Sequence, residues 1–179
     1  EARPRRPRAE PPPLLRDPRT WQVLSLATLL TWGTVWLGFD QPVHRIALAI
    51  AAALATEALL APLIANRPFE PRSALISSLS LCLLLRTSDA WLMVLGSAIA
   101  ISSKYMIRFD GKHVFNPTNL AISVLVAFSG AAWISPAQWG SATWSAFLFA
   151  CLAITVLSRS KRIDIAAAFL GTVVALLFA

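Results

Sequence analysis

The sequence predicts an all-α, polytopic helical membrane protein, and three observations carry this prediction. Hydrophobic residues make up 56% of the 179 residues, and the mean hydropathy is +0.63. Charged residues make up only 14%, whereas soluble domains carry about 25%. The charges also stand in short clusters between apolar stretches, which is typical of membrane topology even though the net charge is +7. We therefore expect the lipid bilayer as a partner, and no nucleic acid.

Two regions are predicted. In residues 1–20, arginines alternate with prolines, which favours a disordered basic cytoplasmic tail able to contact anionic lipid headgroups. Residues 21–179 are predicted to form the transmembrane domain. The chain begins with Glu1 and stops within an apolar run, so we expect it to be part of a longer protein.

Seven apolar stretches predict about six to seven spans. The stretches 21–39 and 43–65 are long enough to cross a hydrocarbon core of about 30 Å unaided. Shorter stretches are predicted to recruit neighbouring neutral residues or to form tilted or broken helices, and the third and fourth could form a re-entrant pair. The remaining stretches are 74–85, 90–102, 120–134, 144–157 and 163–179.

The basic residues predict the orientation. With a cytoplasmic N-terminus and seven alternating crossings, all but two of the 16 Lys and Arg residues fall on the cytoplasmic side. Only Arg45 and Arg86 fall outside. Such a bias follows the positive-inside rule and supports this orientation and the parity of the crossings.

A polar segment, residues 102–119, is predicted to hold the functional site. Asp110 and Gly111 are a tight-turn pair, so the chain should double back after Phe109. Asn116 should N-cap a helix that begins at Pro117.

The start of that helix presents free N–H groups and the positive end of the helix dipole. With Lys104, Lys112 and His113 nearby, this place would suit a phosphate, the edge of a flavin ring or a quinone carbonyl. A plain cytoplasmic loop is the alternative.

The run SKYMIRFDGKHVFNPTN resembles the SKY…GKHIFNP signature of a family of membrane subunits. That family holds the D subunit of Rnf electron-transport complexes and the B subunit of the sodium-pumping NADH:quinone reductase. The resemblance implies a urea-transporter-like inverted-repeat fold, of which this chain would hold the first repeat and part of the second. It implies a multi-pass subunit of the bacterial inner membrane that passes electrons together with other membrane-protein subunits. It also implies a flavin, FMN or riboflavin, with candidate ligands Lys104, Lys112, His113, Asn116, Thr118 and Asn119.

Family members also attach FMN covalently to a threonine in a Ser/Thr-Gly-Ala-Thr motif. Ala142 and Thr143 match this motif, but Ser141 stands where the family has glycine, and Gly140 where it has Ser or Thr. Glycine lets the backbone approach a phosphate closely, and Ser141 removes that freedom. The departure favours a polar turn, and a divergent short branch that holds its flavin non-covalently or binds none. Thr143 remains a candidate flavin contact.

Glu57 is the only carboxylate deep within a predicted span. A charge at that depth costs about 2.5–3.5 kcal/mol on insertion scales, so Glu57 should be protonated, paired or facing a polar cavity. A proton relay and a cofactor contact are the functional interpretations. A structural hydrogen bond to Thr56 or Thr31 is the other.

Three functions remain open. The leading one is a membrane-embedded electron-transport-type subunit of a larger complex, which would be at most a redox subunit of a multi-subunit oxidoreductase. The others are a cofactor-free structural or assembly subunit and a small-molecule transporter. Cys82 and Cys151 lie in apolar runs, which argues against a disulfide scaffold. The sequence has no His-x-x-His or carboxylate cluster that would predict a metal site.

Overall fold

Each of the seven apolar stretches of the sequence contains a helix, although the stretch 120–134 is helical only as far as Phe128 and ends in a strand. The computed structural model of the chain describes residues 17–135, 139, 143–161 and 163–178, except for the side chain of Lys112. These residues are mostly helical, as predicted. The helices are α2 (Pro18–Val35), α3 (Val43–Ala65), α4 (Pro71–Leu84), α5 (Ala90–Met106), α6 (Pro117–Phe128), α7 (Thr143–Ser160) and α8 (Ile163–Phe178).

The first helix begins inside the predicted tail. The side chain of Asp17 caps α2 by accepting a hydrogen bond from the backbone N–H of Arg19, at 2.9 Å, and Pro18 opens the helix. The prediction that residues 17–20 belong to a disordered tail is therefore wrong. The rest of the predicted tail, residues 1–16, lies outside the described residues.

Two of the described helices, α3 and α7, are long and apolar enough to cross a membrane. The stretch 43–65 was predicted to cross a membrane unaided, and α3 is long and apolar enough to do so. The same prediction for the stretch 21–39 is wrong, because α2 is not apolar enough. With 18 residues α2 has the length, but Gln22, Ser25 and Thr28 lower its hydropathy. The stretch 144–157, predicted as short, gains residues at both ends and becomes α7.

Four short strands depart from the purely helical prediction. The strands β1 (Leu85–Thr87) and β4 (Ala132–Ile134) pair antiparallel. The strands β2 (Arg108–Phe109) and β3 (Lys112–His113) form a hairpin. Its turn is the predicted Asp110-Gly111 pair, whose φ angles of 50° and 75° lie in the left-handed region that such tight turns use.

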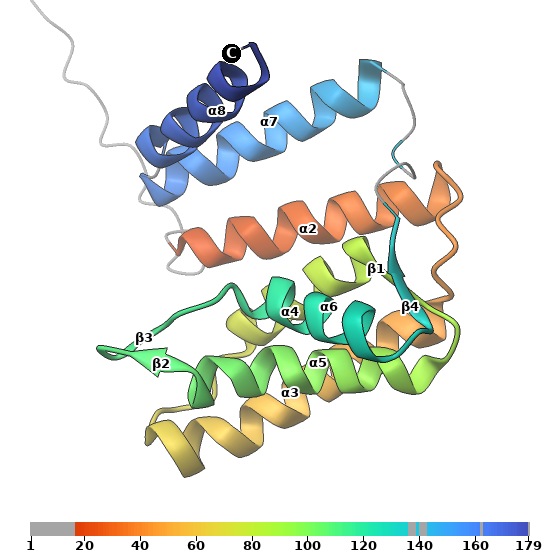
Figure 1. Ribbon diagram of the computed structural model, residues 1–179, viewed down its shortest axis with the longest axis vertical. Coiled ribbons are helices and arrows are strands. Elements are labelled where there is room, and N and C mark those ends of the chain that lie inside the picture. Colours follow the sequence, from red (N-terminus) through yellow and green to blue (C-terminus); the bar gives the residue numbers. More distant parts are fainter. Residues whose placement is uncertain (1–16, 136–138, 140–142, 162, 179) are drawn as a thin grey trace, which may run out of the picture.

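The helices α2 to α7 lie roughly alongside one another, and their connections gather at two ends (Figure 1). We call one the basic end; it carries the start of α2, the α3–α4 connection, the β2–β3 hairpin and the α7–α8 connection. The other, the strand end, carries β1 and β4. Arg159 of α7 stacks on Trp21 of α2 at the basic end, with Cζ 4.7 Å from the ring centroid.

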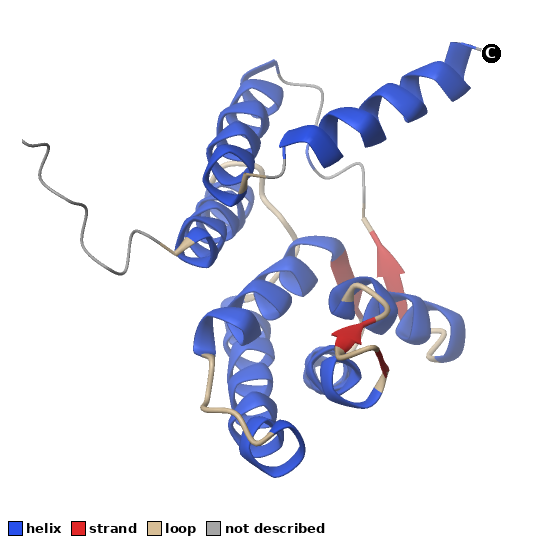
Figure 2. Cartoon of the chain, turned by 90° about the vertical axis from the view of Figure 1, so that its left-hand side faces the viewer, coloured by secondary structure: helices blue, strands red, loops and turns tan. Residues whose placement is uncertain are grey.

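The core lies where α4, α5 and α6 meet, with α2 and α3 packed around them. Gly96 of α5 lets Leu125 of α6 approach so closely that a Cβ at position 96 would lie 2.8 Å from its Cδ1. The last helix differs, because α8 packs on α7, has no buried residue and diverges from the others in Figure 2. The largest fully buried apolar side chains are Leu81, Leu85, Leu92, Met93 and Ile101.

Candidate functional site

One face of α3 brings a carboxylate into the bundle. Ala49, Ala53, Glu57 and Ala61 are the buried residues of α3, and they recur every four residues. Residues at this spacing share a helix face. The small alanines let α5 pack closely against this face, so Glu57 points toward α5 rather than away from the bundle.

Glu57 is paired and also lines a polar cavity, which are two of the three arrangements predicted from its depth. Its side chain is 3% exposed, and Oε2 accepts a hydrogen bond from Lys104 Nζ of α5 at 2.8 Å. Its Oε1 accepts from the Tyr105 hydroxyl, also at 2.8 Å. Lys104 Nζ donates a further bond to Ser73 Oγ of α4, at 3.0 Å. The two threonines predicted as partners do not bind it: Thr56 donates to the carbonyl of Ala52 in its own helix, and Thr31 is exposed on α2.

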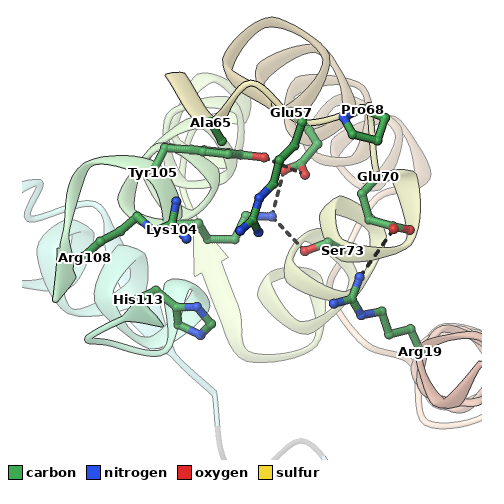
Figure 3. Close-up of a pocket in the computed structure, with 11 residues that line it drawn as sticks. Arg19, Glu57, Ala65, Pro68, Glu70, Ser73, Lys104, Tyr105, Arg108 and His113 are labelled. Carbon is green, nitrogen blue, oxygen red and sulfur yellow. Dashed lines mark hydrogen bonds and ion pairs between the residues drawn. The ribbon is translucent and has the colours of Figure 1, made fainter. Parts of the chain in front are cut away.

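This cluster forms one wall of a cavity of about 280 Å³ at the basic end. Figure 3 shows Glu57, Tyr105 and Ser73 around the Lys104 amine, with Arg108 and His113 on one side of them. Arg19 and Glu70 lie on the other side. Among the described residues, the lining consists of Arg19, Glu57, Ala65, Arg67, Pro68, Glu70, Ser73, Lys104, Tyr105, Arg108 and His113.

Ion pairs tie the cavity wall to the start of α2. Glu70 lies 3.4 Å from an Arg19 nitrogen and 3.7 Å from an Arg72 nitrogen. Arg72 also pairs with Asp17, the N-cap of α2. These contacts hold the first turns of α2 and α4 together beside the cavity.

The structure divides the predicted flavin ligands between two places. Lys104 and His113 line the cavity, whereas the start of α6 does not. Asn116 caps α6 as predicted, accepting from the N–H groups of Thr118 at 3.0 Å and Asn119 at 3.3 Å. The Thr118 hydroxyl is buried and donates to the carbonyl of Ser77 in α4, at 3.3 Å. Asn116 and Thr118 thus position α6, and Asn119 is exposed.

Two further candidates stand apart from the cavity. The backbone of Lys112 pairs with Phe109 in the hairpin, but its side chain lies outside the described residues. Thr143 is exposed and begins α7 at the strand end, away from the cavity (Figure 1). The other residues of the motif, 140–142, lie outside the described residues.

The two arginines of the strand end form hydrogen bonds with backbone carbonyls in and around β1. Arg86 is 4% exposed and donates to the carbonyls of Cys82 and Leu85, both at 2.8 Å. Burial lowers the pKa of Arg86 below its ordinary value. Arg45 donates to the carbonyls of Thr87 and Ser88. These arginines satisfy backbone acceptors where α4 gives way to β1.

Sequence reasoning singled out Glu57 and Lys104 but did not bring them together. It missed Ser73, Tyr105, Arg67 and Arg108 as cavity residues. The four-residue spacing of the alanines around Glu57 was an available signal for the face that α5 covers. For Ser73 and Arg67, the sequence offered no local signal.

Comparisons of this chain with protein-family models, with curated proteins and with solved structures found no match.

Proposed function

We propose that the chain is a membrane-embedded, electron-transport-type subunit of a larger complex, with a flavin held non-covalently in the cavity at the basic end. The proposal includes the inverted-repeat fold and the bacterial inner membrane that the sequence resemblance implies. The N-terminus and the basic end would face the cytoplasm.

Exposed apolar side chains support the membrane part of this proposal. On α7, Trp144 is 78% exposed and Phe147 63%; on α8, Leu177 is 75% exposed. Soluble proteins rarely expose apolar patches of more than a few hundred Å². A bilayer, or neighbouring membrane subunits, would cover the apolar faces of α7 and α8.

The distribution of charge supports the orientation. Among the described residues at the strand end, Arg45 and Arg86 are the basic ones, and both bind backbone carbonyls. The basic end carries Arg19, Arg67, Arg72, Lys104, Arg108, Arg159 and Lys161. This is the asymmetry expected of a cytoplasmic face.

The convergence of four residues carries the flavin part of the proposal. Lys104, Tyr105, Arg108 and His113 all belong to the segment that resembles the family signature, and all line one cavity. Binding pockets are usually concave sites with a few convergent polar groups. Here a hydroxyl, an ammonium, a guanidinium and an imidazole converge on the opening. A positive charge beside a flavin favours its reduced, anionic form.

An absorption spectrum of the purified protein before and after acid precipitation tests this function. We expect flavin absorption in the native protein and flavin in the supernatant after precipitation. Flavin in the pellet, lost in Thr143→Val, would instead show covalent attachment at Thr143. A protein that is colourless after purification, and after incubation with FMN or riboflavin, would contradict the proposal.

One observation favours a cofactor-free structural subunit as the second candidate. The polar groups around Glu57 satisfy one another, since both carboxylate oxygens, the Lys104 amine, the Tyr105 hydroxyl and Ser73 are joined by hydrogen bonds. Such a fully hydrogen-bonded network can stabilise the packing of α3, α4 and α5 without a ligand. A folded protein that binds no flavin, yet is required for assembly of its complex, would support this alternative.

A further inference from the structure

The cavity wall carries more positive than negative charge. Its lining holds four basic side chains, from Arg19, Arg67, Lys104 and Arg108, and two carboxylates, from Glu57 and Glu70. Including Arg72 and Asp17, which pair directly with this wall, gives five basic groups against three carboxylates. The described wall therefore has two positive charges in excess.

The excess lies on Arg67 and Arg108. Glu57 is neutralised by Lys104, Glu70 by Arg19, and Asp17 by Arg72. Within the described part of the chain, the Arg67 side chain has neither a hydrogen bond nor an ion pair. Arg108 donates to the carbonyl of Gly111 and forms no ion pair with a described carboxylate, which leaves its charge uncompensated among the described residues.

Both arginines line the same cavity, together with Tyr105. Arg108 is also held in place, because its strand pairs with β3 and brings His113 opposite to it in the register. The hairpin thus fixes one guanidinium and one imidazole at the opening of the cavity.

We propose that the cavity binds a phosphate monoester and that Arg67 and Arg108 hold its phosphate. A phosphate monoester carries about −1.5 to −2 charges at pH 7, which matches the excess of two. The planar guanidinium fork suits two phosphate oxygens at once. His113, which also lines the cavity, adds an imidazole beside them. FMN and an anionic lipid such as phosphatidic acid share this chemistry, and the FMN source rests on the proposed flavin function.

Riboflavin provides the matched probe, because it has the FMN ring without the phosphate. With the full chain in detergent, we expect FMN to bind at least about tenfold more tightly than riboflavin, with inorganic phosphate competing. Arg67→Gln and Arg108→Gln should each weaken FMN binding about tenfold and weaken riboflavin binding much less, because riboflavin has no phosphate. Lys161→Gln, which removes a charge from the same end but outside the cavity, should have no effect. Arg67→Lys, which keeps the charge but loses the fork, should bind FMN with intermediate affinity.

The outcomes separate the two proposals. Equal binding of FMN and riboflavin, insensitive to Arg67→Gln and Arg108→Gln, would overturn the phosphate site and leave the flavin function standing. If neither flavin binds but phosphatidic acid in nanodiscs binds with the same sensitivity to both variants, the phosphate site holds and the flavin function fails. Absence of binding by FMN, inorganic phosphate and phosphatidic acid would overturn the phosphate site.

Discussion

At the scale of single residues, Glu57 and Lys104 form a buried ion pair in which each charge compensates the other. Their side chains are 3% and 11% exposed. Removing one partner of a buried ion pair leaves the other charge desolvated and uncompensated. The Tyr105 hydroxyl and Ser73 complete the hydrogen bonding, so the pair is embedded in a satisfied network.

Lys104→Ala should lower the free energy of unfolding by about 3–5 kcal/mol, because it leaves the buried Glu57 carboxylate without a compensating positive charge. Arg72→Ala is the control, since the Arg72–Asp17 pair is about one third exposed and should cost no more than about 1 kcal/mol. Denaturant unfolding in detergent measures both. Adding Glu57→Gln to Lys104→Ala should recover part of the loss; strictly additive losses would contradict a coupled pair.

Asn116 is expected to act locally. Asn116→Ala removes an N-cap and should cost about 1 kcal/mol of stability. Since Asn116 does not line the cavity, flavin content should stay at the wild-type level, in contrast to Arg108→Gln. Asn119→Ala keeps the cap and should change neither quantity. Loss of flavin in Asn116→Ala would return the binding site to the start of α6.

At the scale of elements, a glycine in a helix allows a neighbouring side chain to pack directly against the helix backbone. Gly33 of α2 lies under the Phe39 ring, which follows α2 and packs edge-on against Trp139 at a centroid distance of 4.7 Å. A Cβ at position 33 would lie 2.3–2.7 Å from three atoms of that ring. The chain after α2 folds back onto the helix because this space is open.

Gly33→Ala should therefore destabilise the protein by about 1–3 kcal/mol through overpacking. Gly171→Ala makes the same substitution in α8, where a Cβ would meet no atom within 4 Å. That variant should be neutral, or more stable by up to about 1 kcal/mol, because alanine favours the helix. Thermal unfolding of both variants in the same detergent gives the comparison; equal effects would show that Phe39 does not pack on α2 as described.

At the scale of the whole molecule, α2 to α7 lie alongside one another, and most of the described basic side chains gather at one of the two ends of this bundle. Ion pairs join α2 to α4, and Lys104 joins α5 to α3 and α4, all at the basic end. At the strand end, Arg45 and Arg86 both donate hydrogen bonds to backbone carbonyls. The two ends thus differ in chemistry as well as in charge.

Cysteine labelling tests how these ends face a membrane. In a Cys151→Ala background, where Cys82 is buried, single cysteines at Glu70 or Ser160 should resist an impermeant thiol reagent in intact cells. A cysteine at Ser88, at the strand end, should react. After permeabilisation, positions 70 and 160 should react as well. The opposite pattern in intact cells would reverse the orientation.

Local chemistry determined the parts of this fold that the sequence could predict. Proline and asparagine fix the start of α6, and the Asp110-Gly111 pair fixes the hairpin turn, because these residues restrict their own backbone. Apolar stretches located every helix. The start of α2 was missed because the Asp17 cap stood among the prolines of the predicted tail.

Only the tertiary structure decided which helix faces meet. Helices that are apolar nearly all round carry little periodic signal for the face that is buried, so the sequence left the partner of Glu57 open. Lys104 lies 47 residues away and reaches Glu57 only because the alanine face of α3 packs on α5. Likewise, β1 and β4 form only when the ends of α4 and α6 come together. The cavity is lined by α2, α3, the α3–α4 connection, α4, α5 and the β2–β3 hairpin. Its excess charge exists only after packing has paired Glu57, Glu70 and Asp17 with other cations.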